Sequence, residues 1–389
     1  MAMRVALLVL LVVVVFGLAR VAIGRNVDAA CERNEWPYLS ACPGTKQSVA
    51  EQVSDLRRRA DRNPGDATSY LALLVLAHQH GEVAPIKEDE LLATVKLLAG
   101  NNPLFLKIQA TRAVQGEQWH EAVQLLGRIA TQYRDEVAIK TMATLVTVPE
   151  ARKALVEALQ GGGLWLPSLL RTLPSVNVPA VQAMPLVESG LSLGLLKPDM
   201  VLDVVGQLKR AGNWLEAQAL WLRLLGRPVP VLFNGGFETG FVRGGFDWEV
   251  QDGSPNRTGV RIAQPTMVGA QGRVLEMAFN GRPLVVPVIS QHVVLFPGSY
   301  TFTGRYMTRR LRAGAGLTWV FACTSGKNEL ARTAAIKDTK GAWQNMEMQV
   351  AVPNGCGAVF MQLQTELRSD ALSGLQGDAH FDDFRLVAN

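Results

Sequence analysis

The stretch NGGFETGFVRGGFDW, residues 234–248, decides how this chain is organised. Its fifteen positions hold five glycines, three phenylalanines and a tryptophan, and it follows a leucine-rich region of helical periodicity. Glycine weakens helices and suits tight turns, whereas aromatic residues favour strands. The stretch therefore predicts the beginning of a β domain, with Phe237, Phe241 and Phe246 in its core.

Downstream of this stretch, apolar and polar residues alternate. Residues 299–306, 318–323 and 359–365 all show a period of two, and clusters of Gly, Pro, Asn and Asp separate such runs at short intervals. That pattern is typical of antiparallel strands in a two-sheet sandwich. We therefore expect an all-β domain over residues 231–389.

Upstream, residues 48–226 have the periodicity of helices. Ser48 and Glu51 have the spacing of a capping box, and the prolines of 227–230 end the helical pattern. Residues 116–126 and 212–221 share, in this order, a Gly, a Trp and a Glu-Ala pair. They resemble the turns of tetratricopeptide repeats. The resemblance implies an all-α, tetratricopeptide-like domain; an irregular helical array remains the alternative.

The N-terminus holds an uninterrupted apolar run, Val5–Ala19, followed by Arg20 and a shorter apolar segment. With Arg20 reaching toward the interface, the run through Ile23 approaches the length of a bilayer span. No small-residue cleavage site follows it directly, so residues 1–25 are predicted to be an uncleaved signal anchor, a transmembrane helix, rather than a cleaved signal peptide. Residues 26–47 would form a linker.

The four cysteines form two local pairs. Cys31 and Cys42 follow the apolar segment, whereas Cys323 and Cys356 lie in the β domain, and no CxxC motif is present. An even count in such pairs suits disulfides made in an oxidising compartment. We therefore expect an inner-membrane anchor with the body of the protein in a bacterial periplasm.

Short motifs in the β domain carry a family resemblance. Asn234-Gly-Gly-Phe-Glu238, Phe246-Asp-Trp248, the segments 297–302 and 341–343, and His380–Leu386 occur in order. Together they resemble a carbohydrate-binding module of the galactose-binding-like jelly-roll type, in the branch often attached to xylan- and glucan-degrading enzymes. The resemblance implies a polysaccharide or oligosaccharide as partner.

The same resemblance implies a structural calcium ion between the first and last strands. Glu238 and Asp382 are the matching oxygen ligands. Alternation places Asp382 on the face of Phe384 and Leu386, where a carboxylate needs a partner. An Arg–Asp pair or a hydrogen-bonded edge carboxylate is the alternative to calcium.

Sugar binding needs flat aromatic rings for pyranose CH groups and planar polar groups for hydroxyls. If Cys323 pairs with Cys356, alternation from these cysteines places Trp319 on the same side as Gln362 and Gln364. The candidate carbohydrate-binding residues are Trp319, Gln362, Gln364, Arg305, Trp248 and Trp343, and each aromatic one has a place in the core as its alternative.

Other classes of function find little support in the sequence. The net charge is only +5 and no long basic block exists, so nucleic acid is not an expected partner. No phosphate-binding loop or dinucleotide motif occurs, and GLSLG, residues 190–194, lies in a helical region unsuited to a nucleophile elbow. We therefore expect a non-catalytic, membrane-anchored envelope protein, which binds polysaccharide through its jelly roll and other envelope proteins through its helices, with a role in surface polysaccharide export or assembly. A scaffold whose sandwich contacts only proteins is the alternative.

Overall fold

A computed structural model describes residues 48–80, 88–242, 244–250, 254–270, 272–326 and 328–389. The predicted signal anchor (1–25) and the linker with Cys31 and Cys42 lie outside these residues. Within the described part of the chain, no helix is both long and apolar enough to cross a membrane.

The chain divides between Thr172 and Leu173 into two compact units. The helices of the first unit are α2 (Val49–Arg62), α3 (Ala67–Gln79), α4 (Glu88–Ala99), α5 (Pro103–Gln115), α6 (Trp119–Gln132), α7 (Glu136–Leu145), α8 (Pro149–Ala158), the 3₁₀ turn η1 (Leu159–Gly161) and α9 (Leu166–Thr172). Helices α2 to α7 pack each against the next, so the predicted helical region is confirmed. Its tetratricopeptide-like identity stays a prediction.

Local sequence explains where these helices begin. Ser48 and Glu51 form the predicted capping box, in which each side chain bonds the backbone of the other residue. Asp66, Asn102 and Asp135 likewise accept a backbone N–H of the first turn of α3, α5 and α7. These bonds satisfy donors that have no partner inside a helix.

The second unit begins with helices and continues into the sandwich. Its helices are η2 (Leu173–Val176), η3 (Ala180–Ala183), α10 (Met184–Ser192), α11 (Pro198–Arg210), α12 (Trp214–Leu225) and the short α13 (Pro255–Thr258) and α14 (Arg368–Ser373). Helix α12 ends at Leu225, next to the predicted boundary at 226–231, and the first strand begins at Glu249. The compact unit starts earlier, so α10, α11 and α12 belong with the sandwich.

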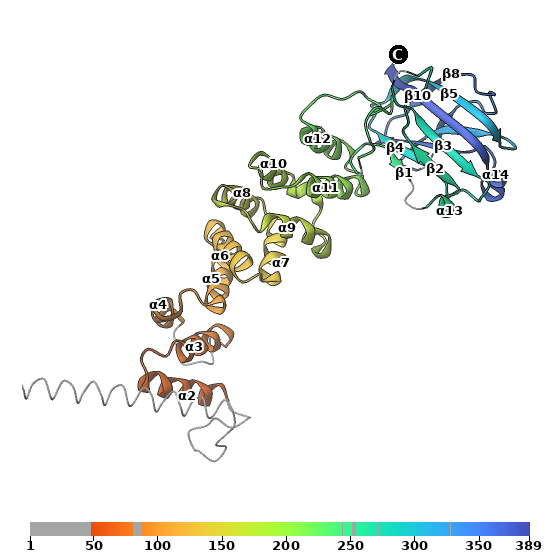
Figure 1. Cartoon of the computed structure of the whole chain (residues 1–389). Coiled ribbons are helices and arrows are strands. Elements are labelled where there is room, and N and C mark those ends of the chain that lie inside the picture. The colour runs from red at the N-terminus through yellow and green to blue at the C-terminus, as the bar shows by residue number, and fades with distance from the viewer. Residues whose placement is uncertain (1–47, 81–87, 243, 251–253, 271, 327) are drawn as a thin grey trace, which may run out of the picture. The chain divides into compact units, whose positions relative to one another are not determined.

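Two antiparallel five-stranded sheets make the sandwich, as predicted (Figure 1). Sheet A has the order β1 (Glu249–Val250), β4 (Ile289–Val293), β9 (Val359–Thr365), β6 (Leu317–Cys323), β7 (Glu329–Arg332). Sheet B has the order β2 (Val260–Ala263), β3 (Leu275–Asn280), β10 (Gln376–Ala388), β5 (Gly298–Arg312), β8 (Gln344–Val352).

Aromatic side chains fill the space between the sheets. The ring centroid of Trp319 lies 5.1 Å from that of Phe384 and 5.7 Å from that of Trp248. Phe237 and Phe246 are buried and Phe241 packs against the core, as predicted.

The opening stretch of the domain closes against the end of the chain's last strand. The Phe384 amide donates to Gly235 O at 3.0 Å, and the Trp248 indole donates to Asn234 O at 3.0 Å. A side chain at Gly235 would place its Cβ only 2.1 Å from Phe384 O, so glycine is required by this close approach. The predicted disulfide between Cys323 and Cys356 is also present.

Candidate functional site

One face of sheet A, turned away from the core, gathers polar side chains from adjacent strands. On β9, Met361 and Leu363 point into the core, so the alternate residues Phe360, Gln362 and Gln364 point outward. In the register of the sheet, Gln362 lies between Ser290 of β4 and Val320 of β6. We call these side chains the outer face of sheet A; they are Ser290, His292, Thr318, Val320, Arg332, Phe360, Gln362, Gln364 and Glu366. Ser290, Thr318 and Val320 are buried, and the others are at least partly exposed.

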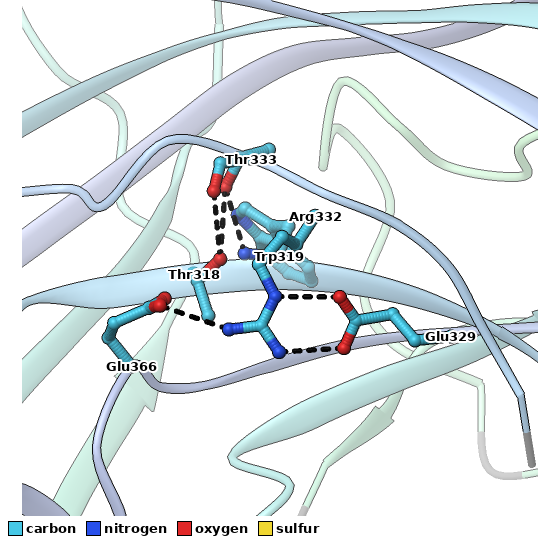
Figure 2. A network of polar contacts seen from close by, with 6 residues as sticks. All are labelled: Thr318, Trp319, Glu329, Arg332, Thr333 and Glu366. Atoms are coloured by element: carbon cyan, nitrogen blue, oxygen red, sulfur yellow. Dashed lines mark hydrogen bonds and ion pairs between the residues drawn. The ribbon is translucent and has the colours of Figure 1, made fainter.

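An arginine clamped by two carboxylates borders this face, as Figure 2 shows. Arg332 donates from Nε and Nη2 to the two oxygens of Glu329 at 2.7 and 2.6 Å, and from Nη1 to Glu366 at 3.0 Å. The hydrogen bonds to Glu329 raise the pKa of the Arg332 guanidinium above its usual range. Thr318 and Thr333 lie beside this group, where Thr318 Oγ1 donates to Thr333 O at 3.1 Å. The network holds a planar cation between two carboxylates in a fixed position.

Rings lie at the opposite end of the face. The imidazole of His292 lies 4.7 Å from the ring of Phe360, between centroids. Glu249 Oε1 is 3.4 Å from His292 Nδ1 and 2.8 Å from Lys209 Nζ. Burial by itself would raise the pKa of Glu249, but the His292 and Lys209 contacts outweigh burial and lower that pKa to about 2.

Two of the predicted sugar-contacting residues belong to the core instead. The Trp319 side chain is 0% exposed and that of Trp248 is 2% exposed. Trp319 lies opposite Leu363 in the sheet register, so it points inward while Gln362 and Gln364 point outward. The prediction that Trp319 shares a face with these glutamines is therefore wrong.

The reason lies in the segment between Cys356 and β9. Cys356 precedes the strand, and Gly357 has a φ of +75°, which is not a strand conformation. Alternation counted from Cys356 consequently does not continue into β9. The disulfide lies in the core, on the side of Trp319, but the glutamines do not follow it.

Arg305 and Trp343 are brought together, but on sheet B. The Arg305 guanidinium carbon lies 5.1 Å from the centre of the Trp343 ring, a cation–π contact. Arg305 belongs to β5, so it does not reach Gln362 or Gln364 on β9 of the other sheet. The six predicted residues therefore divide into a core pair, a pair on sheet B and a pair on the outer face of sheet A.

Asp382 also lies on a different face from the one alternation predicts. The pairing of β10 with β5 is shifted between Asp382 and Arg385, and Asp383 has a φ of +53°. This bulge turns Phe384 and Leu386 into the core while Asp382 meets Arg305 on the other side, at 2.7 Å between Oδ2 and Nη2. The alternative of an Arg–Asp pair is thus what the structure shows.

Glu238 has a separate partner. Its Oε2 accepts the Arg273 amide at 3.1 Å, whereas Asp382 Oδ1 accepts the Asp383 amide at 2.8 Å. Among the described residues, no group of three or more His, Cys, Asp or Glu side chains is placed to hold a metal ion. These contacts do not test a calcium ion shared by Glu238 and Asp382, so calcium binding stays a prediction.

Sequence reasoning missed the residues that surround the two glutamines. Arg332 contacts Glu329 and Glu366 because β7 pairs with β6 through an irregular register. No local sequence pattern predicts this irregularity. Ser290 and His292 share the face because β4 pairs with β9 across a long separation in sequence. Only the alternation of Phe360, Gln362 and Gln364 was visible in the sequence.

Comparison with known proteins finds similarity among solved structures, several of which are carbohydrate-binding modules. No protein-family model matches the chain, and no curated protein matches it. Among solved structures, a carbohydrate-binding module of family 4 is 14% identical, with 41% of this chain and 99% of that chain covered and a TM-score of 0.31. A family 61 module in complex with β-1,4-galactotriose is 16% identical, with 42% and 100% covered and a TM-score of 0.26. A tandem of two family 22 modules from Paenibacillus barcinonensis is 15% identical, with 39% and 43% covered and a TM-score of 0.28.

Proposed function

We propose that the β-sandwich binds an oligosaccharide segment through the outer face of sheet A. The observation that carries the proposal is the pair of half-buried amides, Gln362 and Gln364, between the ring of Phe360 and the clamped Arg332. Planar amides and a fixed guanidinium can each bond sugar hydroxyls, and an aromatic ring can cover the CH side of a pyranose.

The charges of this face favour a neutral ligand. Arg332 is paired with both Glu329 and Glu366, and Lys209 is paired with Glu249. Two cations and three carboxylates leave an excess of one negative charge. A phosphate-rich partner would need the opposite excess, so a neutral sugar fits this surface better than nucleic acid does.

In this proposal the protein is a non-catalytic component of the cell envelope. The apolar run Val5–Ala19 supports an anchor in the inner membrane, and the Cys323–Cys356 disulfide supports an oxidising compartment such as the periplasm. In this proposal the helices of the first unit bind other envelope proteins, and the protein takes part in the export or assembly of a surface polysaccharide.

The test is binding of the full-length chain to a glycan array, followed by calorimetry with soluble cellohexaose and xylohexaose. The double variant Gln362→Ala/Gln364→Ala should bind at least about tenfold more weakly, since each lost hydrogen bond contributes on the order of 1 kcal/mol. Gln344→Ala, an exposed glutamine of β8 in sheet B, is the matched control and should bind as the unchanged protein does.

Two results would contradict the proposal. If no glycan on the array is retained, the sandwich is better explained as a scaffold that contacts proteins only. If sugar binds equally well to the double variant and to the unchanged protein, the sugar site lies elsewhere on the chain.

A further inference from the structure

A tryptophan of helix α12 lies beside the rings of His292 and Phe360 on the outer face of sheet A. Trp214 is the first residue of α12, and Gly212, with a φ of +80°, makes the turn that separates α12 from α11. The Trp214 ring is stacked on the imidazole of His292, with 5.0 Å between centroids and 25° between planes. Since His292 in turn contacts Phe360, three rings form a continuous row that ends two residues from Gln362.

Other contacts fix α11 and α12 against the sandwich, within one compact unit. Lys209, at the end of α11, donates to Gly245 O at 2.8 Å. Trp221 packs its ring against Phe233 and Phe246, with centroids 4.9 and 5.6 Å away. Trp221 is 3% exposed, so it already serves as the buried aromatic anchor of this junction.

Trp214 differs from Trp221 in a way that points to another role. It is only half-buried, and it borders Gly357, where a Cβ would come within 3.2 Å of Trp214 Cδ1. Gly357 lies two residues before the start of β9, so the indole lies at the beginning of the strand that carries Gln362 and Gln364. An anchor needs burial, whereas a surface ring aligned with other rings of a face is suited to contact a ligand.

We propose that Trp214 is a ligand-contacting residue, so that the sugar-binding unit includes α12 as well as the sandwich. The proposal rests on the proposed function and adds a segment outside residues 231–389 to the site. Its ligand is a neutral pyranose-containing oligosaccharide, one ring of which lies on the row of Trp214, His292 and Phe360 while its hydroxyls bond Gln362.

The experiment uses the full-length chain labelled with 5-fluorotryptophan and observed by ¹⁹F NMR. The resonance missing from Trp214→Phe identifies Trp214, and it should shift on addition of cellohexaose or xylohexaose. In calorimetry, Trp214→Ala should weaken binding about tenfold, and Trp214→Phe, which keeps an aromatic ring, should weaken it less.

The matched control is Trp119→Ala. Trp119 is also half-buried and also opens a helix, α6, after a similar turn in the first unit, where Glu117 with a φ of +54° takes the place of Gly212. It should leave sugar binding unchanged. The Trp214 resonance should also remain unshifted by either hexasaccharide in the Gln362→Ala/Gln364→Ala variant.

The outcomes separate this proposal from the one on which it rests. If the unchanged protein binds sugar and the glutamine variant does not, but the Trp214 resonance stays in place and Trp214→Ala binds normally, Trp214 is only a structural residue and the proposal is overturned. If neither hexasaccharide and no arrayed glycan binds the unchanged protein, the proposed function and this inference both fail.

Discussion

Arg305 on β5 and Asp382 on β10 form an ion pair, with 2.7 Å between Nη2 and Oδ2. The Asp382 side chain is 1% exposed. Arg305 Nε also lies 2.7 Å from Asp383 Oδ2. This contact is an ion pair but not a hydrogen bond. Burial raises the pKa of Asp382, and Arg305 opposes that rise.

Arg305→Met should therefore leave a buried carboxylate without its cation. Because the arginine side chain is itself partly exposed, we expect a loss of about 2–3 kcal/mol in the free energy of unfolding, below the cost for a fully buried pair. Urea denaturation measures it, with the exposed Arg385→Met on β10 as control. The loss should be smaller at pH 4 than at pH 8, since a raised folded-state pKa means that the protonated carboxyl is better tolerated inside. Equal stability of the two variants would contradict this account.

Gly235 and Gly236 are neighbours with opposite constraints. A Cβ at Gly235 would meet Phe384 O at 2.1 Å, whereas one at Gly236 has only an ordinary contact of 3.8 Å with Glu238. Gly235→Ala should lower the free energy of unfolding by about 2–3 kcal/mol through overpacking, and Gly236→Ala should be nearly neutral. A thermal melt of both variants decides this, and equal melting temperatures would refute the role given to Gly235.

Trp319 and Gln362 should respond in opposite ways to truncation. Trp319→Ala removes a fully buried ring and should cost about 3–5 kcal/mol in stability. Gln362 is half-buried on the outer face of sheet A. Gln362→Ala should therefore change the free energy of unfolding by less than about 0.5 kcal/mol while it weakens sugar binding. If Trp319→Ala keeps its stability and loses only its affinity for sugar, Trp319 belongs to the binding face and not to the core.

Glu249 should make the junction between α11 and the sandwich sensitive to acid. Its folded-state pKa of about 2 lies below its ordinary value of 4.5, so its stabilising effect is present above pH 4.5 and is lost as the pH falls toward 2. Glu249→Gln should flatten the decline of the urea midpoint in this range, whereas the exposed Glu347→Gln on β8 should not. Parallel declines in all three proteins would argue against the Lys209–Glu249–His292 contacts as the cause.

The Cys323–Cys356 disulfide closes a loop with a sequence separation of 33. Chain-entropy estimates for such a loop give about 3–4 kcal/mol, so Cys323→Ala/Cys356→Ala should be less stable by that order. Dithiothreitol should destabilise the unchanged protein but not lower the sandwich transition of the double variant. In the unreduced, denatured protein, a thiol assay should find no free cysteine, which also tests the predicted Cys31–Cys42 bond.

The architecture could be predicted from patterns that are local in the chain. The change of hydrophobic period after residue 231 separated helices from strands, and the glycines of 234–248 marked the turn into the sandwich. The core position of Phe237, Phe241 and Phe246 followed from this pattern, and the Cys323–Cys356 bond followed from the place of both cysteines in the β domain. These features depend on short-range preferences, which the sequence carries directly.

The face on which each residue lies was harder to predict, because one irregular residue reverses it. Gly357 interrupts alternation before β9, and the bulge at Asp383 does so within β10, so Gln362 and Asp382 each changed sides. The contact of Trp214 with His292 could not be predicted at all, since it depends on how a helix packs against a sheet. The errors for Gln362 and Asp382 thus come from local breaks in alternation, and the missed Trp214 contact comes from packing between segments that are distant in the sequence.

The order of strands in sheet B has a consequence for how the protein is synthesised. β10 lies between β3 and β5, so every strand from β1 to β9 leaves the ribosome before the one that joins these two neighbours. Until residues 376–388 emerge, β3 and β5 each expose an edge that could pair with another nascent chain. The newly made sandwich therefore passes through a period in which two strand edges of sheet B lack the partner that later separates them from solvent.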